Sequence, residues 1–334
     1  MGHCAVLGAG AWGTALARVM AERNPKVTLW TWQREHASRM QAERENREFF
    51  PGFNLPAVVV PTASLEEALV GADLVVLALP SHVMRANLAA ARTHFARDAI
   101  IANATKGIEN GSLRLMTEVI LEELGSERTP FVTVLSGPSF AKEVGLQMPT
   151  NIVLAASDRT VGEAAQQRLA TERFRVYTSD DLVGVQLGGA LKNVIAIAAG
   201  ACDGLGFGHN SRAALITRGI AEITRLAVRA GANPLTLSGL AGMGDLILTC
   251  TGELSRNRTV GFELGRGAEL EQVLSGLGHV AEGVTTAKSA YDYATRLGVE
   301  MPITTEVYRV LFEKKPTLVA VKDLVGRPLR RELD

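Results

Sequence analysis

One lysine in an almost uncharged stretch is the first residue of this chain that could do chemistry. Residues 183–200 read VGVQLGGALKNVIAIAAG, and Lys192 is the one ionisable side chain among them. Apolar residues recur there at four-residue spacing, which predicts a buried or half-buried helix. An ammonium group in such a helix needs a charged partner, access to water or a lowered pKa. A lysine with a lowered pKa can donate and accept protons near neutral pH.

Two alternatives to a reactive Lys192 stay open from the segment alone. The lysine can reach out of one face of a core helix, with its apolar stem buried and its ammonium in water. The second alternative is that the segment spans a membrane. It is short and glycine-rich, however, and carries Gln186, Lys192 and Asn193 near its middle. We therefore expect no membrane span.

A glycine-rich turn near the N-terminus predicts a dinucleotide site. Gly8, Gly10 and Gly13 form the pattern GxGxxG between a β-rich run, residues 3–7, and a helical pattern, residues 14–20. The first glycine permits the turn, the second lets a pyrophosphate approach the backbone, and the third lets helix and strand pack closely. Backbone N–H groups and the helix dipole then face the phosphates.

The end of the second strand-like run, residues 26–32, concerns the choice between NAD and NADP. A site that prefers NAD commonly carries an acid there, about 20 residues past the glycines, to bind the ribose hydroxyls. No acid occurs before Glu35, and Arg34 is placed to meet a 2′-phosphate. The pattern favours NADP or the use of both cofactors. The alternative is that Arg34 is a solvated surface charge.

Strand-like runs alternate with helical patterns through the first half of the chain, which predicts a doubly wound, mostly parallel sheet of the Rossmann type. The later runs are residues 57–60, 73–79, 99–102 and 131–135, with 151–155 and 174–176 as candidate additions. In such sheets, ligands bind outside the carboxyl ends of the strands. The loop of residues 103–107 follows one of these strands, so the topology places Lys106 at the ligand crevice.

The pattern changes near residues 178–181. Strand-like runs become scarce, and helical periods dominate over residues 211–230, 284–297 and 303–312. We therefore expect two domains. Residues 1–179 form a dinucleotide-binding domain, and residues 180–334 form an all-α domain that carries substrate and catalytic residues.

Three polar positions of the helical half are candidates for chemistry. Asp245 ends a glycine-rich turn, where it either caps a helix or orients a lysine or a substrate hydroxyl. Residues 255–258, SRNR, begin a helical pattern with a hydroxyl, an amide and two guanidinium groups, which favours an anion site over a solvated helix start. Glu282 stands beside Gly283 and either contacts the nicotinamide end of a cofactor or caps a helix.

The composition limits the classes of function. The 334 residues are 47% hydrophobic and 21% charged, as in globular proteins. Lys plus Arg and Asp plus Glu number 35 each, which argues against a general nucleic-acid or membrane-surface binder. The N-terminus enters a strand-like run without a signal peptide pattern, so we expect a cytoplasmic protein.

The cysteines and histidines suggest no metal site. Cys4, Cys202 and Cys250 are far apart, and neither CxxC nor HExxH occurs. Cys250 has no basic neighbour to activate it, so a small buried thiol is the expected state. His82 and His209 lie in turn-rich or glycine-rich contexts and receive no role.

Seven segments carry a joint signature in order along the chain. They are GAGAWGTALA from Gly8, ATKGIE from Ala104, SGPSFAKEV from Ser136, GALKNVIAIAAG from Gly189, GLAGMGDLILTC from Gly239, SRNR from Ser255 and VAEGV from Val280. Together they resemble the bacterial family of NAD(P)-dependent sn-glycerol-3-phosphate dehydrogenases over nearly the whole length. The family often has a basic residue or histidine where this chain has Trp32, a departure that affects any preference for NADP.

The resemblance implies a reaction and its residues. NAD(P)H would reduce dihydroxyacetone phosphate to sn-glycerol 3-phosphate, reversibly, for phospholipid synthesis. Lys192 would donate and accept the proton, Lys106 would polarise the carbonyl oxygen, and Asp245 would orient the lysine or the hydroxyls. The implied substrate contacts are Lys106, Gly137, Ser139, Lys192, Asp245, Ser255, Arg256 and Asn257. The implied cofactor contacts, beyond the three glycines and Arg34, are Ala11, Trp12, Lys106, Ala141, Arg256, Val280 and Glu282. A homodimer formed through the helical domain is also implied.

Two alternative functions remain. One is a related two-domain hydroxyacid dehydrogenase that acts on a carboxylate in place of a phosphate, and substrate profiling separates it from the first. The other is a dinucleotide-sensing binding protein without turnover. Two lysines with Asp245 argue against the sensor, because a sensor needs no buried proton donor.

Overall fold

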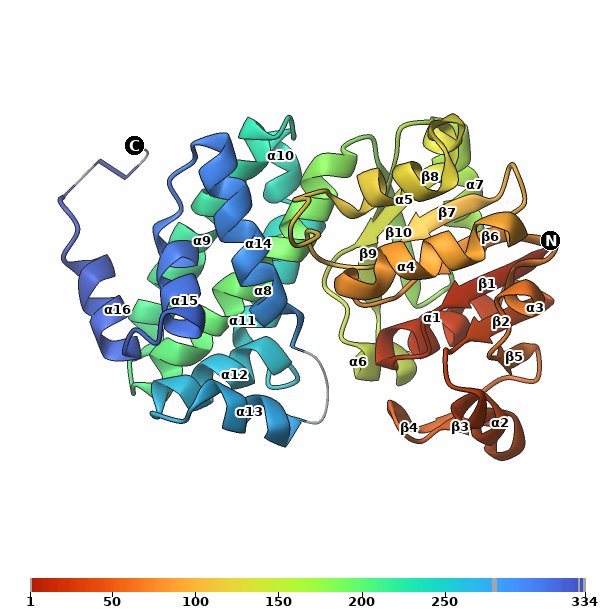
Figure 1. Cartoon of the computed structure of the whole chain (residues 1–334), viewed down its shortest axis with the longest axis horizontal. Coiled ribbons are helices and arrows are strands. Elements are labelled where there is room, and N and C mark those ends of the chain that lie inside the picture. Colours follow the sequence, from red (N-terminus) through yellow and green to blue (C-terminus); the bar gives the residue numbers. More distant parts are fainter. Residues whose placement is uncertain (1, 278–280, 330, 333–334) are drawn as a thin grey trace.

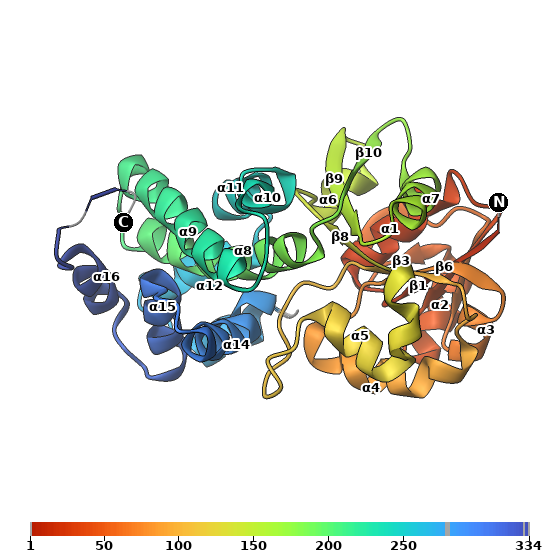
Figure 2. The same cartoon turned by 90° about the horizontal axis from the view of Figure 1, so that it is seen from above.

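The computed structural model describes residues 2–277, 281–329 and 331–332. One half of the chain contains the main sheet and the other half is helical, with the two termini at opposite ends of the molecule (Figure 1). The view from above shows the same division, with α8 reaching from the helical half toward the sheet (Figure 2). The predicted fold class, a mostly parallel Rossmann-type sheet followed by a helical part, is confirmed.

Eight strands form the main sheet in the order β10-β9-β8-β7-β6-β1-β2-β5. Their bounds are β1 His3–Leu7, β2 Lys26–Trp30, β5 Val59–Thr62, β6 Ala72–Leu77, β7 Ile100–Asn103, β8 Val132–Ser136, β9 Thr150–Ala156 and β10 Phe174–Ser179. Neighbouring strands are parallel except β8 and β9, which are antiparallel. A separate antiparallel pair, β3 Glu45–Asn46 and β4 Phe50–Asn54, was not predicted from the sequence.

Strand β2 ends earlier than the sequence pattern predicts. It stops at Trp30, whereas the apolar run continues to Trp32. The chain leaves the sheet after Thr31 to begin α2, so Trp32 is 76% exposed. The apolar character of Trp32 therefore does not reflect burial in the sheet.

Helices cover both faces of the sheet. Their bounds are α1 Ala11–Ala21, α2 Arg34–Glu43, α3 Leu65–Leu69, α4 Ser81–Ala91, α5 Met116–Leu124, α6 Ala141–Gly145 and α7 Arg159–Leu169, with 3-10 turns at Arg92–His94 and Ser126–Phe131. Alternate residues of β1 point to opposite faces. Cys4 and Val6 join one core with α1 and α7, whereas Ala5 and Leu7 join another with α3, α4 and α5. Burial on both faces explains why residues 4–7 of β1 are all apolar.

The helical half is built around α8, Leu182–Gly204. The other elements are α9 His209–Arg229, α10 Pro234–Leu237, a π-helical turn Leu240–Gly244, α11 Asp245–Thr251, α12 Arg256–Gly265, α13 Leu270–Leu277, α14 Glu282–Leu297, α15 Pro302–Phe312 and α16 Thr317–Val325. Glycines let α8 and α12 touch. A Cβ on Gly200 would lie 1.9 Å from the Arg258 carbonyl oxygen, and one on Gly261 would lie 1.8 Å from the Ile197 carbonyl oxygen.

Helix α8 is long and apolar enough to cross a membrane, but 83% of its apolar window is buried inside the protein. Its residues from Gly184 to Cys202 are all buried. Helices α9, α11, α12 and α14 pack around it. Its apolar surface is therefore explained by its place in the core of the helical half.

Candidate active site

Two lysines meet on one buried carboxylate. Asp245, the first residue of α11, is fully buried, and its Oδ2 accepts a hydrogen bond from Lys106 Nζ at 2.7 Å. Its Oδ1 accepts one from Lys192 Nζ, which also donates to Thr249 Oγ1 at 2.9 Å. Lys192 is only 7% exposed. Its ammonium therefore has a charged partner inside the protein and does not reach out to water.

Two glycines of α8 allow this meeting, because they let the helix lie against both halves of the protein. A Cβ on Gly188 would lie 2.5 Å from the Ala241 carbonyl oxygen, in the turn that leads into α11. A Cβ on Gly189 would lie 2.4 Å from Ser136 Oγ and 3.7 Å from Lys106 Cδ. Side chains at these positions would push α8 away from the π-helical turn, from the end of β8 and from the loop after β7.

The cluster perturbs the acidity of its members. The pKa of Lys192 is lowered to about 8, because burial and the ammonium of Lys106 lower it more than the carboxylate of Asp245 raises it. An amine with such a pKa exists in both protonation states near neutral pH. Burial also raises the pKa of the neighbouring Cys250 thiol to about 12. Cys250 is therefore a neutral buried thiol, with no thiolate for nucleophilic chemistry.

Two of the predicted phosphate ligands also have structural contacts at the start of α12. Ser255 caps the helix, since its hydroxyl accepts from the Arg258 N–H at 3.2 Å. Asn257 is buried, donates to Asn193 Oδ1 at 3.0 Å and accepts from the Gly283 N–H at 2.9 Å. Asn257 thereby ties together α8, α12 and α14.

Arg256 carries the exposed positive charge of this helix start. Glu282, the first residue of α14, has its pKa raised by burial, and Arg256 and the two lysines act in the opposite direction. These three cations of the predicted site therefore act on the same carboxylate, and Asp245 raises its pKa further. On the sheet side, Gly137 has a φ of 147°, and Ser139 Oγ donates to its carbonyl oxygen at 3.0 Å. This turn directly follows β8, at the carboxyl end of the strand.

The glycine turn has the geometry that a dinucleotide needs. Gly8 has a φ of 113°, and a Cβ there would lie 2.4 Å from the Ala78 carbonyl oxygen. A Cβ on Gly13 would lie 1.9 Å from the Gly8 carbonyl oxygen, so α1 packs directly against the turn. A Cβ on Gly10 meets no atom within 4 Å. The space above Gly10 is thus open where the motif places a pyrophosphate.

Four of the other predicted cofactor residues, Ala11, Trp12, Arg34 and Ala141, lie in the sheet half, whereas Lys106, Arg256 and Glu282 belong to the charged groups described above. Trp12 is half-buried and packs on Phe174, with ring centroids 6.5 Å apart. Among the described residues its indole N–H is buried without a hydrogen-bond partner. Arg34 is exposed at the start of α2. Ala11 and Ala141 begin α1 and α6, which contact each other. Val280 lies outside the described residues.

A buried polar network behind the glycine turn was missed by the sequence reasoning. Thr31 Oγ1 lies 3.2 Å from His36 Nδ1, and His36 Nε2 lies 2.9 Å from Asn46 Oδ1. Asn46 Nδ2 donates to the Ala9 carbonyl oxygen and to Thr14 Oγ1, both at 2.8 Å. Because Asn46 Oδ1 can only accept, His36 Nε2 donates to it, and in the neutral imidazole Nδ1 then accepts from the threonine hydroxyl. No local pattern in the sequence indicates this network.

Thr249 was also missed, although a signal for it exists. It lies four residues after Asp245 on α11, and residues at that spacing share a helix face. Its hydroxyl accepts from Lys192 and donates to the Asp245 carbonyl oxygen at 2.6 Å. The spacing could have found it once Asp245 was chosen.

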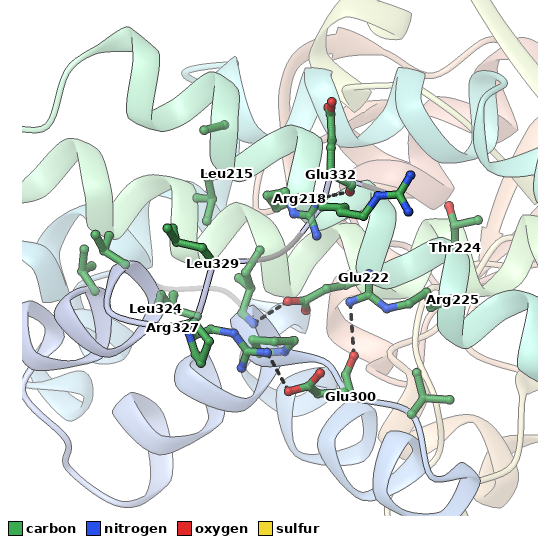
Figure 3. Close-up of a pocket in the computed structure, with 18 of the residues that line it drawn as sticks. Leu215, Arg218, Glu222, Thr224, Arg225, Glu300, Leu324, Arg327, Leu329 and Glu332 are labelled. Carbon is green, nitrogen blue, oxygen red and sulfur yellow. Dashed lines mark hydrogen bonds and ion pairs between the residues drawn. The ribbon is translucent and has the colours of Figure 1, made fainter. Parts of the chain in front are cut away.

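A second hollow lies away from this cluster. A cavity of about 1180 Å³ is lined by α9, by the start of α15 and by the segment after α16 (Figure 3). Glu222 lies on its wall, where burial raises its pKa to about 7. The Glu222 carboxylate accepts from the backbone N–H groups of Ile303 at 2.6 Å and Thr304 at 3.2 Å. The described lining includes neither lysine nor Asp245, so this cavity is not where the clustered charges converge.

Comparison with known proteins gives consistent matches. Residues 3–162 match the N-terminal domain of NAD-dependent glycerol-3-phosphate dehydrogenase, and residues 181–322 match its C-terminal domain. The chain is 54% identical to the glycerol-3-phosphate dehydrogenase (NAD(P)+) of Geobacter sulfurreducens and 53% identical to that of Myxococcus xanthus, each over 98% of both chains. A crystal structure of glycerol-3-phosphate dehydrogenase from Coxiella burnetii superimposes with a TM-score of 0.93. It is 40% identical, with 98% of this chain and 99% of that chain covered.

Proposed function

The chain belongs to the NAD-dependent glycerol-3-phosphate dehydrogenase family, and we propose that Lys192 donates and accepts the proton in its reaction. The enzyme reduces dihydroxyacetone phosphate with NAD(P)H to glycerol 3-phosphate, and the reaction is reversible. The cofactor supplies the hydride. The observation that carries the role of Lys192 is its buried ammonium, which bonds Asp245 and has a lowered pKa.

The remaining chemistry falls to the neighbours of Lys192. In reduction, the Lys192 ammonium gives its proton to the carbonyl oxygen of the substrate, and in oxidation the neutral amine takes it from the hydroxyl. Lys106 polarises the same oxygen and keeps the pKa of Lys192 low by like-charge repulsion. Asp245 holds both lysines in place with its two oxygens. Its full burial supports this orienting role, since a buried carboxylate without cations would be costly.

The phosphate of the substrate would bind at the start of α12. Arg256 supplies an exposed guanidinium there, and Ser255 and Asn257 supply a hydroxyl and an amide beside the helix N-terminus. We extend the substrate site to Gly137 and Ser139, which follow β8 at the carboxyl edge of the sheet. We expect Arg256→Ala to raise the KM for dihydroxyacetone phosphate about ten- to a hundredfold, because it removes a charge-assisted hydrogen bond.

The cofactor would lie along the glycine turn, with contacts to Ala11, Trp12 and Ala141 and to Glu282 at its nicotinamide end. The open space at Gly10 supports this placement. Arg34 is exposed where β2 leads into α2, as contact with a 2′-phosphate requires. We therefore propose that NADPH is used at least as well as NADH. A kcat/KM for NADH tenfold or more above that for NADPH would contradict this proposal.

One substitution tests the role of Lys192. We expect Lys192→Met to lower kcat for dihydroxyacetone phosphate at least about a hundredfold, the usual scale for a general acid or base. NADPH binding, measured by fluorescence titration, should remain, because the methionine keeps the stem and Lys192 is not among the proposed cofactor contacts. Near-normal kcat in Lys192→Met would remove the proposed role. A 2-keto acid without a phosphate serves as the control substrate and should react poorly with the wild type.

The broader setting is proposed on family membership. We divide the chain into a dinucleotide-binding domain, residues 1–179, and a substrate domain, residues 180–334, in accord with the end of β10 at Ser179 and the start of α8 at Leu182. We propose a cytoplasmic homodimer, formed through the helical domain and without nucleic-acid partners, that supplies phospholipid synthesis. Light scattering of the purified protein tests the dimer.

A further inference from the structure

The loop of residues 107–115 begins directly after Lys106 and leads to α5. It folds back on itself, with the Glu109 N–H donating to the Arg114 carbonyl oxygen at 2.9 Å. The Leu113 N–H donates to the Glu109 carbonyl oxygen at 3.0 Å, and Ile108 pairs with Leu115 as an antiparallel bridge. The loop is thus an ordered hairpin, and the position of Lys106 depends on where this hairpin is held.

The apolar side chains of this loop pack with the helical half. Ile108 is 1% exposed and Leu115 is 6% exposed, and both belong to the core that contains Leu191 of α8 and Ala287 of α14. Leu113 packs against the same core. The loop therefore belongs to the sheet half by sequence and to the helical half by packing.

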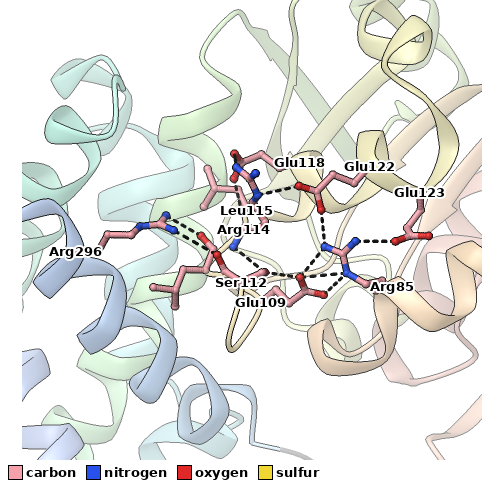
Figure 4. A network of polar contacts seen from close by, with 10 residues as sticks. Arg85, Glu109, Ser112, Arg114, Leu115, Glu118, Glu122, Glu123 and Arg296 are labelled. Carbon is pink, nitrogen blue, oxygen red and sulfur yellow. Dashed lines mark hydrogen bonds and ion pairs between the residues drawn. The ribbon is translucent and has the colours of Figure 1, made fainter.

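An arginine of α14 fastens the tip of the loop. Arg296 donates to the Ser112 carbonyl oxygen at 3.3 Å and to the Leu113 carbonyl oxygen at 3.1 Å, and it points from α14 toward the loop (Figure 4). Leu113 has a φ of 58°, which L side chains rarely adopt. A guanidinium that binds two successive carbonyl groups compensates for such a conformation.

A second arginine holds the base of the loop on the sheet side. Arg85 of α4 forms a two-pronged ion pair with Glu109, at 2.8 Å between Nη2 and Oε2 and 2.9 Å between Nε and Oε1. The same guanidinium reaches Glu122 at 2.7 Å and Glu123 at 2.6 Å on α5 (Figure 4). Arg85 also lowers the pKa of Glu109. Three carboxylates on one guanidinium make a stronger anchor than a single exposed ion pair.

We propose that Arg296 and Arg85 are positioning residues for the reaction, which hold the loop of residues 107–115 across the two halves so that Lys106 stays on Asp245 beside Lys192. This inference rests on the roles proposed above for the two lysines. Releasing the loop would withdraw the ammonium of Lys106 from the cluster.

The withdrawal has a specific electrostatic consequence. The groups that face Lys192 are Asp245 and the Cys250 thiol on α11, Glu282 on α14, and Lys106. Of these, Lys106 is the one that carries a like charge. Its withdrawal removes one of the two effects that lower the pKa of Lys192 and leaves only burial to oppose Asp245, so this pKa rises. The pH dependence of glycerol 3-phosphate oxidation then moves to higher pH, an effect that a general loss of stability does not produce.

The test is a double-mutant cycle on the purified full-length enzyme. We expect Arg296→Ala to lower kcat for glycerol 3-phosphate oxidation about ten- to a hundredfold at neutral pH, because misplacing a reacting group by about 1 Å costs on that order. The rising limb of its pH profile should lie at higher pH. In the Lys106→Met background, Arg296→Ala should add less than about a twofold loss, since the residue it positions is gone. Arg296→Lys should restore part of the rate.

The loop provides its own matched control. Arg114 lies on the same loop but pairs with Glu118 at 3.1 Å and Glu122 at 2.8 Å on α5. Arg114→Ala leaves in place the ion pair of Arg85 with Glu109 and the hydrogen bonds from Arg296 to the loop, so it should keep wild-type kinetics. Arg85→Ala releases the other side of the loop and should reproduce the pattern of Arg296→Ala, which keeps the test decisive if Arg296→Ala does not fold.

Several outcomes would overturn the inference. A wild-type kcat and pH profile in both arginine variants would do so, as would an equal loss from Arg296→Ala with and without Lys106. If Lys106→Met alone keeps a normal kcat, the role proposed for Lys106 fails, and the inference fails with it. If Lys106→Met is inactive while both arginine variants are normal, only the inference fails.

Discussion

The glycine-rich turn and the lysine–aspartate cluster are built in opposite ways. The turn, residues 8–13, is one contiguous segment whose properties come from the backbone and from absent side chains. The cluster joins side chains that are 139 residues apart, for Lys106 and Asp245, and 53 residues apart, for Lys192 and Asp245. A turn of this kind is specified by local sequence, whereas the cluster exists only when both halves of the protein have assembled.

This difference predicts that the turn and the cluster are sensitive to different kinds of substitution. The turn should be sensitive to added volume and indifferent to charge, because Gly8 and Gly13 lie against backbone atoms. The cluster should be sensitive to the loss of a single charge, because it balances two ammonium groups against one buried carboxylate. Four predictions separate these two kinds of sensitivity.

The largest effect is expected from Asp245→Asn. This change leaves two lysines facing each other without a countercharge, and breaking a buried ion pair in this way costs about 3–5 kcal/mol of unfolding free energy. The cost should shrink at alkaline pH, since Lys192 can then lose its proton. Urea denaturation at neutral and at alkaline pH measures the loss of unfolding free energy and its decrease with rising pH. Asp292→Asn, in an exposed pair with Lys288, is the control and should be near neutral. A loss below about 1 kcal/mol in Asp245→Asn would contradict the charge balance described here.

The next effect compares two alanines in the glycine turn. Gly13→Ala places a Cβ 1.9 Å from the Gly8 carbonyl oxygen and should lower the unfolding free energy by about 1–3 kcal/mol. Gly10→Ala meets no atom within 4 Å and should change stability by less than about 1 kcal/mol. It should still weaken NADPH binding, because the methyl group enters the space proposed for the pyrophosphate. Normal NADPH affinity in Gly10→Ala would place the cofactor elsewhere.

The third prediction concerns pH. Burial lowers the pKa of Lys192 to about 8, and oxidation needs the neutral amine. The kcat for glycerol 3-phosphate oxidation should therefore rise about tenfold per pH unit below this value and level off above it. Reduction needs the ammonium, so its kcat should fall as pH rises through the same value. Flat profiles in both directions, with hydride transfer shown to be rate-limiting, would remove the titrating amine from the mechanism.

The smallest effect is expected from Thr249→Val. The threonine hydroxyl accepts a hydrogen bond from the Lys192 ammonium at 2.9 Å, and its loss costs about 1 kcal/mol. Because this bond favours the charged form, its removal should lower the pKa of Lys192 and move the oxidation profile to lower pH. Thr251→Val is the control, since that exposed hydroxyl bonds only the Ile247 carbonyl oxygen of its own helix. A shift of the oxidation profile to higher pH in Thr249→Val would show that the hydroxyl does not stabilise the charged form of Lys192.

Much of the fold and of the candidate site followed from local patterns in the sequence. The GxGxxG turn was placed correctly because its three glycines fall within six consecutive residues where a strand leads into a helix, and Gly13 packs against Gly8 inside the same segment. The apolar run around Lys192 predicted a buried helix, and α8 is one. Lys106 was placed near the crevice because parallel strands present their carboxyl ends at one edge.

The tertiary structure alone decided which side chains meet. No periodicity indicates that the hairpin after Lys106 packs into the helical half, that His36 and Asn46 brace the glycine turn, or that β9 runs antiparallel to β8. Local patterns report the secondary structure and the buried face of each segment. The pairing of those faces depends on packing between segments that lie far apart in the chain. The charge of Lys192 was therefore visible in the sequence, while its partners Asp245 and Thr249 and its lowered pKa were set by the fold.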